Sequence, residues 1–180
     1  MFVLYAIPIG ILVGYLSGGR LDRLSAARLR WDPLILFGLL VQIAIFTDAG
    51  GRLVGDAGPA IYVASTAAVL IAVLGNAGVP GVALIAVGAA TNLAAIVANG
   101  GWMPADQAAL TSVGGLGSGY TNSVISAEPA LRPLTDLFAL PPWLPLANVF
   151  SVGDVLIGIG VAATIALAMR SPKPSTAPLR

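Results

Sequence analysis

Asp136 and Asp154 are the residues of this chain whose type and spacing could support acid–base chemistry. They stand eighteen positions apart, in the segments LTDLF and VFSVGDVLIGIG. Two carboxyl groups held close together cannot both ionise at low cost, so one keeps a proton while the other is a carboxylate. The carboxylate can activate a water molecule and the protonated partner can donate to a leaving group. The sequence therefore offers a candidate catalytic pair for hydrolysis.

The amino-acid composition excludes several other catalytic mechanisms. The 180 residues include no His and no Cys, and Lys173 in a proline-rich tail is the only lysine. This excludes Ser-His-Asp catalysis, thiolate chemistry and the usual zinc and haem ligands. We therefore expect no cofactor and no metal. With a net charge of +1, nucleic acid is not expected as a partner.

Asp154 also has a purely structural interpretation. Ser151-Val-Gly-Asp154 fits the capping box, in which Ser151 caps a helix and the residue three positions later reaches back to the cap's N–H. A carboxylate there also meets the positive end of the helix dipole. Capping alone would explain an aspartate at this position, so a functional role requires further support.

The elements that position these residues are long apolar segments. The chain is 57% hydrophobic and 9% charged, with a mean hydropathy of +0.92, whereas soluble domains have about 25% charged residues. Apolar runs of about 17–25 residues can cross a bilayer as helices. We predict an all-α integral membrane protein with one domain, residues 1–180, and five spans near residues 2–18, 31–47, 59–75, 80–99 and 149–169.

Basic residues predict the orientation of these spans. An N-terminus outside the cell would place seven of the nine basic residues in the cytoplasm, in the loop after the first span and in the tail of residues 170–180. Basic residues favour cytoplasmic loops, so we predict a multi-pass protein of the inner membrane with its C-terminus in the cytoplasm. The first loop is either a short interfacial helix with arginines toward lipid headgroups or an ordinary basic loop.

Residues 101–148 form an outer loop too long for a simple connection. Its aromatic and apolar content predicts an ordered cap with one or two short helices, and LTDLFALPPWLPL is expected to be interfacial or re-entrant. GGLGSGY within the loop is interpreted as a flexible linker. Beneath the cap we expect a polar, ligand-binding pocket, although Gln42 and Asn92 would also serve to hold helices together. The candidate pocket residues are Gln42, Asn92, Asn99, Asn148 and Asp154.

Gly10, Gly14 and Gly18 form a ridge of small residues at a spacing of four. Such a ridge lets helices approach closely. It is expected to pack within the bundle, and a homo-oligomer contact is the alternative. The lipid bilayer is the expected environment, and a lipid or another membrane protein is the expected class of partner.

Segments of this chain resemble two known protein families. ANGGWMP (98–104) and ANVFSVGDVLIGIG (147–160) resemble a bacterial polytopic membrane-protein family known only as a domain of unknown function, which implies no activity. VFSVGDVLIGIG is also similar to the FN-V/I/L-AD-x-A-I-x-x-G segment of lipoprotein signal peptidase, an intramembrane aspartyl protease. That resemblance implies catalytic roles for Asp136 and Asp154. Here Ser151 replaces the family's Asn and Gly153 its Ala, and the G-N-x-x-D-R segment has no clear match.

Three functions follow as expectations. The first is a binding or accessory protein with a polar pocket at the outer leaflet. The second is an intramembrane aspartyl hydrolase that uses Asp136 and Asp154. The third is a small transporter, for which the sequence shows neither a charged residue at mid-membrane nor an inverted repeat.

Overall fold

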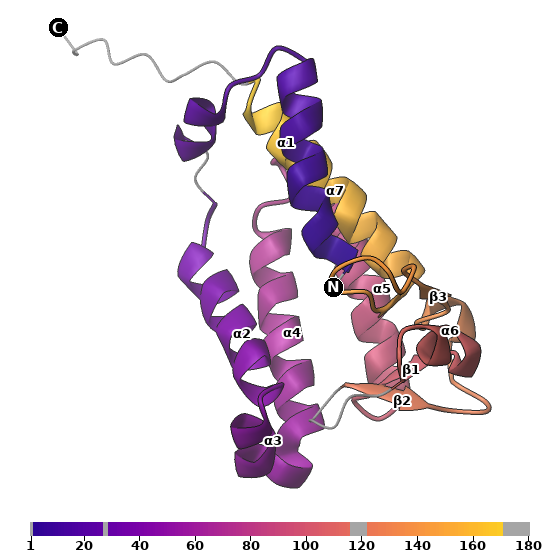
Figure 1. Cartoon of the computed structure of the whole chain (residues 1–180). Helices are drawn as coiled ribbons and strands as arrows, with labels where there is room; N and C mark the ends of the chain where they lie inside the picture. The colour runs from indigo at the N-terminus through magenta and orange to yellow at the C-terminus, as the bar shows by residue number, and fades with distance from the viewer. Residues whose placement is uncertain (1, 27–28, 116–121, 171–180) are drawn as a thin grey trace, which may run out of the picture.

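Apolar helices dominate the computed structural model, which describes residues 2–26, 29–115 and 122–170. Figure 1 shows these helices running in alternating directions between two ends of the molecule. They are α1 (Ala6–Leu16), α2 (Asp32–Ile45), α4 (Gly58–Leu74), α5 (Val82–Ala98) and α7 (Val152–Ala168). Arg28, residues 116–120 of the predicted linker and residues 171–180 of the predicted tail lie outside the described residues.

One helical run is long and apolar enough to cross a membrane. It covers the 26 residues Ala49–Leu74, within which an 18-residue stretch has a mean hydropathy of 2.0. The run consists of most of α3 (Asp48–Val54), the 3-10 turn η3 (Gly55–Ala57) and α4. The other apolar helices have at most 17 residues, about 25 Å at 1.5 Å per residue. The predicted last span begins too early, because Val149 and Phe150 form a strand and α7 begins only at Val152.

The helices pack in a row, with α2 on α4, α4 on α5, α5 on α7 and α7 on α1. Glycines make the α5–α7 contact close. A Cβ added to Gly88 would lie 2.4 Å from the carbonyl oxygen of Gly153, and one added to Gly160 would lie 2.8 Å from that of Gly81. Small residues suit such contacts because they allow backbones to approach.

The glycine ridge of α1 faces α7 of the same chain. Gly10 and Gly14 are buried, and added Cβ atoms would meet Ala162 and Met169, respectively. The ridge therefore packs within the bundle, as expected. Gly18 lies in open space beyond the helix, and a homo-oligomer stays a prediction.

A cap of short elements follows α5. It contains β1 (Met103–Ala105), α6 (Gln107–Ser112), β2 (Ser123–Ile125), η4 (Arg132–Leu134), β3 (Phe138–Ala139) and β4 (Val149–Phe150). β1 pairs in parallel with β2, Met103 opposite Ser123, and β3 pairs antiparallel to β4, Phe138 opposite Phe150. These strands were not predicted. The segment expected to be an interfacial or re-entrant element forms β3 and turns, and its three prolines, which lack an N–H, disfavour a helix there.

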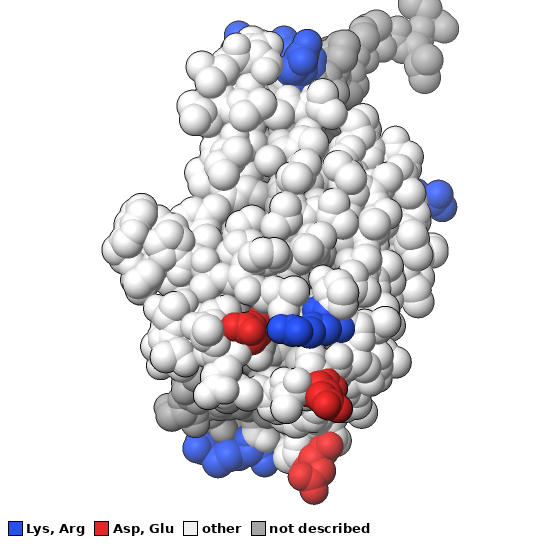
Figure 2. Space-filling view, turned by 90° about the vertical axis from the view of Figure 1, so that its right-hand side faces the viewer, with Lys and Arg blue, Asp and Glu red and all other residues white. Residues whose placement is uncertain are grey.

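The two ends of the molecule differ in charge. At the end opposite the cap, the first loop contains the 3-10 helix η2 (Leu21–Ala26). Arg23 reaches across to α7, where its Nη1 donates to the carbonyl oxygens of Met169 and Arg170 at 3.5 and 3.3 Å. In Figure 2 the top of the molecule carries basic side chains, whereas its lower part carries the visible acidic side chains together with further basic ones. The assignment of the two ends to the two membrane faces stays a prediction.

Candidate functional site

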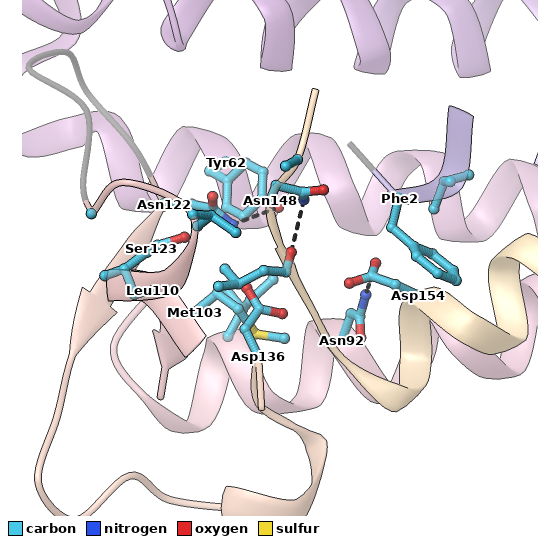
Figure 3. Close-up of a pocket in the computed structure, with 16 residues that line it drawn as sticks. Phe2, Tyr62, Asn92, Met103, Leu110, Asn122, Ser123, Asp136, Asn148 and Asp154 are labelled. Atoms are coloured by element: carbon cyan, nitrogen blue, oxygen red, sulfur yellow. Dashed lines mark hydrogen bonds between the residues drawn. The ribbon is translucent and has the colours of Figure 1, made fainter. Parts of the chain in front are cut away.

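A pocket of about 400 Å³ lies where the cap meets the helices (Figure 3). Side chains from the N-terminal 3-10 turn η1 (Phe2–Tyr5), from α4, α5 and α7, and from the cap line it. Asp136 and Asp154 are both among the lining residues. The fold therefore brings the two candidate carboxylates to one cavity. Asp136 and Asp154 are not themselves partners in a strand pair. The polar lining residues are Tyr62, Asn92, Asn122, Ser123, Asp136, Asn148 and Asp154.

Asp154 lies in a dense hydrogen-bond network at the start of α7. Its Oδ1 accepts from Asn92 Nδ2 at 2.9 Å, and its Oδ2 accepts from the Ser151 N–H at 3.0 Å. The Asp154 N–H donates to Ser151 Oγ at 3.0 Å, which completes the predicted capping box. Ser151 Oγ lies 2.8 Å from Asn92 Oδ1 and 3.2 Å from Asp154 Oδ2, so its single hydrogen serves one of them.

The close approach of Asn92 depends on Gly153. A Cβ at position 153 would overlap the Asn92 side chain and lie 2.8 Å from the carbonyl oxygen of Gly88. Glycine here is therefore what lets an α5 amide reach the first turn of α7. This is the position at which the signal peptidase segment has alanine.

Asp136 is fixed by the backbone of the cap. Its N–H donates to the Pro104 carbonyl oxygen at 3.0 Å, and its own carbonyl oxygen accepts from the Asp106 N–H at 2.9 Å. This bridge beside β1 directs the side chain toward the pocket, where only 7% of the residue's surface is exposed. Burial, followed by the negative charge of Asp154, raises the pKa of Asp136 to about 7. Within the described residues its carboxyl oxygens have no hydrogen-bond partner.

Asn148 offers a second unpaired acceptor. Its Nδ2 donates to the Val149 carbonyl oxygen at 2.7 Å, whereas its Oδ1 is buried with no partner among the described residues. Buried polar atoms without partners are rare in native proteins and call for an explanation, such as a role in binding. Asn148 and Asp136 therefore leave the pocket with unused hydrogen-bonding capacity.

Aromatic side chains form two walls of the pocket that the sequence analysis did not identify. Phe2 stacks on Phe150 with ring centroids 4.4 Å apart, which places the N-terminal turn against β4. Tyr5 Oη also donates to the Pro145 carbonyl oxygen and so ties this turn to the cap. Tyr62 comes from α4, where its hydroxyl accepts from Asn122 Nδ2 at 3.1 Å. No local sequence pattern marks Phe2 or Tyr62, because each joins the pocket through tertiary packing.

Two predicted pocket residues lie elsewhere. Gln42 Nε2 donates to Thr66 Oγ1 at 3.3 Å and links α2 to α4, away from the pocket. Asn99 pairs with the backbone of Ala130, donating to its carbonyl oxygen and accepting from its N–H, both at 2.9 Å. Both amides therefore serve packing and cap attachment, and their assignment to the pocket is corrected. Asn92, Asn148 and Asp154 do line it.

The described residues show no group of three His, Cys, Asp or Glu side chains that could hold a metal ion. What the pocket offers is the Asp154 carboxyl held by donors, the buried Asp136 carboxyl with a raised pKa and the unpaired amide oxygen of Asn148. Such groups can accept hydrogen bonds from a ligand, and a carboxyl pair of this kind can also exchange protons.

Comparison with known proteins supplies the family. No curated protein and no solved structure matches the chain significantly. A family model described as "Family of unknown function (DUF5317)" matches residues 26–166, which include both Asp136 and Asp154. Since the match extends over most of the 180 residues, the chain belongs to this family of unknown function, DUF5317.

Proposed function

We propose that this protein is a multi-pass inner-membrane protein that binds a polar group of a membrane-embedded ligand in the pocket beneath its cap. The alternating helices support five crossings, because they bring the N-terminal turn, the cap and the start of α7 to one end, and the first loop and the end of α7, with Arg20, Arg23 and Arg170, to the other (Figure 1). The outer helices also expose many large apolar side chains, among them Leu12 on α1 and Phe37 on α2. Lipid would cover these surfaces.

The proposed orientation puts the pocket at the outer membrane surface. Because the chain has no cysteine, single cysteines can report it. Glu128 in the cap and Leu29 in the first loop are both exposed. An impermeant maleimide should label Glu128→Cys in intact cells and Leu29→Cys only after lysis. The reverse pattern would refute the orientation.

One observation carries the binding proposal: two acceptors, the Asp136 carboxyl and Asn148 Oδ1, face the pocket without partners among the described residues. Leaving the buried Asn148 Oδ1 unpaired costs about 1–3 kcal/mol. A ligand that donates hydrogen bonds would recover this energy.

The test is mass spectrometry of small molecules that co-purify in mild detergent. Asp136→Asn and Asn148→Leu should lose a molecule that the wild type retains. The matched control is Gln42→Leu, which removes a buried amide outside the pocket. A molecule lost equally from all three variants, or from none, would contradict binding at this site.

A second candidate function, an intramembrane aspartyl hydrolase, is favoured by the two carboxyls in one pocket. At neutral pH, a pKa of about 7 leaves a large share of Asp136 protonated, while Asp154 accepts hydrogen bonds from Asn92 Nδ2 and the Ser151 N–H. Asp154 would accept a proton from water as the water attacks a carbonyl carbon, and Asp136 would donate a proton to the leaving group. The transporter alternative gains no such support, since the five long apolar helices α1, α2, α4, α5 and α7 have no acidic or basic side chain near their middle.

Hydrolysis can be tested by comparing membrane-protein fragments from cells that express the wild type or a variant. Asp136→Asn and Asp154→Asn should abolish the same set of cleavage products. Asp106→Asn serves as the control, because this residue caps α6 through bonds to Ala108 and Ala109. Identical fragments from all four strains would exclude the hydrolase and leave the binding function standing.

A further inference from the structure

We infer that the pocket is selective for an organic ammonium group joined to an apolar chain. This inference rests on the proposed binding function and names the chemical class of its ligand. Among the described residues, the pocket lining combines hydrogen-bond acceptors with no basic side chain, and the rest of the lining is mostly apolar or aromatic, beside the polar Asn92, Asn122 and Ser123.

Charge is the first argument. The described residues that line the pocket include Asp136 and Asp154 but no Arg or Lys. None of these lining residues therefore neutralises the Asp154 carboxylate, which Asn92 and Ser151 hold. A phosphate or carboxylate would meet this negative charge in a partly dry site, whereas a cation would be attracted by it. A second attraction arises whenever Asp136 loses its proton.

The number of acceptors is the second argument. A primary ammonium has three N–H donors and no acceptor. The pocket provides three groups able to receive them: the unpaired Asp136 carboxyl, the unpaired Asn148 Oδ1 and the Asp154 carboxylate, whose oxygens have lone pairs beyond those already engaged. A hydroxyl ligand would use only one donor and leave buried acceptors unsatisfied.

Aromatic and apolar walls are the third argument. Phe2 and Tyr62 line the pocket, and aromatic faces attract ammonium groups through their quadrupoles. Ile96, Met103 and Leu110 also line it and are buried or partly buried, so they can receive the alkyl part of the ligand.

An inorganic divalent cation fits less well. Ca²⁺ takes six to eight oxygen ligands and Mg²⁺ requires near-octahedral coordination. Within the part of the chain that the structure describes, no third acidic side chain joins Asp136 and Asp154. The apolar walls would also contribute nothing to a bare metal ion.

Binding of small probes to the full-length protein in neutral detergent tests this inference. n-Hexylammonium would be compared at pH 8 with 1-hexanol, hexanoate and Mg²⁺, and affinity measured by calorimetry with the thermal midpoint as a second readout. We expect n-hexylammonium to bind at least tenfold more tightly than hexanol, and hexanoate and Mg²⁺ to bind negligibly. Asp136→Asn should weaken the ammonium by about tenfold while changing hexanol little. Asp106→Asn should leave both affinities unchanged.

The results separate this inference from the function on which it rests. Equal binding of n-hexylammonium and hexanol, both lost on blocking the pocket with Asn148→Trp, would overturn the ammonium selectivity and preserve a ligand pocket. Tighter binding of Mg²⁺ or hexanoate would also overturn it. No binding of any probe, with wild type and variants alike, would refute both proposals.

A competition experiment in nanodiscs identifies the source of the ammonium group. If phosphatidylethanolamine, but not phosphatidylglycerol, displaces n-hexylammonium, the ammonium belongs to a lipid headgroup. If neither lipid displaces the probe, the ligand is a soluble amine or a lysine side chain. Both results agree with ammonium selectivity, whereas displacement by phosphatidylglycerol alone would contradict it.

Discussion

Asp136→Asn should make the protein progressively more stable than the wild type as the pH rises from 5 to 8. Burial raises the pKa of Asp136 from 3.8 to about 7 in the folded protein. The folded state therefore binds more protons than the unfolded state between these values, and stability falls as the pH rises through that interval. Below pH 3.8 both states are protonated and the effect vanishes. Above pH 7 the cost of ionising the buried carboxyl is complete.

The expected magnitude follows from that interval. Each pH unit between the unfolded and folded pKa values costs 1.36 kcal/mol, and two such units lie between pH 5 and pH 7. The wild type should therefore lose about 2–3 kcal/mol relative to Asp136→Asn on going from pH 5 to pH 8. For a chain of this size, that corresponds to roughly 5–10 °C in the unfolding midpoint. Only 7% of the Asp136 surface is exposed, so solvent screening reduces the expected loss of stability only slightly.

The assay is thermal unfolding in a neutral detergent at several pH values, with variant and wild type measured side by side. The stability difference between Asp136→Asn and the wild type at pH 5 is subtracted from the same difference at pH 8. This subtraction removes any pH-independent effect of the amide on stability. Asp106→Asn is the control, since Asn and Asp are similar N-caps, and its difference from the wild type should stay constant. If the Asp136→Asn difference also stays constant, the pocket hydrates Asp136 and the argument for a buried carboxyl is wrong.

Three further substitutions test the packing around the site. Gly153→Ala should destabilise the protein by about 1–3 kcal/mol and separate Asn92 from Asp154. The control is Gly78→Ala, which should be nearly neutral because an added Cβ meets nothing within 4 Å. Equal unfolding midpoints for the two variants would contradict the close helix contact. Ser151→Ala should cost about 1–2 kcal/mol through loss of the cap, and no change in midpoint would show that the capping box adds little. Gly14→Leu should cost at least 1 kcal/mol by overpacking the α1–α7 contact, and a neutral result would point to separable helices.

Local chemistry made parts of this structure predictable. Ser151 and Asp154 form the expected capping box, because capping depends on residues three positions apart. The mostly helical architecture and the ordered cap also follow from long apolar runs and from the apolar content of residues 101–148. In each case the information lies within one continuous segment.

The pocket was only partly predictable, because its members meet through tertiary contacts. Asp136 enters it through a backbone bridge to Ala105, and a parallel pairing between such short segments leaves no periodic pattern in the sequence. Polar residue type alone could not separate Asn92, which faces Asp154, from Asn99, which pairs with Ala130. No sequence pattern predicts that Phe2 lines the pocket, because it lies far from α7 in the sequence yet packs beside this helix.

Capping and function are not competing explanations of Asp154. The Asp154 carboxyl accepts from the Ser151 N–H and from Asn92 Nδ2, which fixes its position beside the pocket. Burial, followed by the negative charge of Asp154, raises the pKa of Asp136 to about 7. The residue that caps α7 thereby also acts on the second carboxyl of the pocket. A helix terminus that only needed a cap would gain nothing from a second carboxyl directed into the same pocket. The burial of Asp136, not the presence of Asp154, is therefore the feature that capping leaves unexplained and that binding or acid–base chemistry would explain.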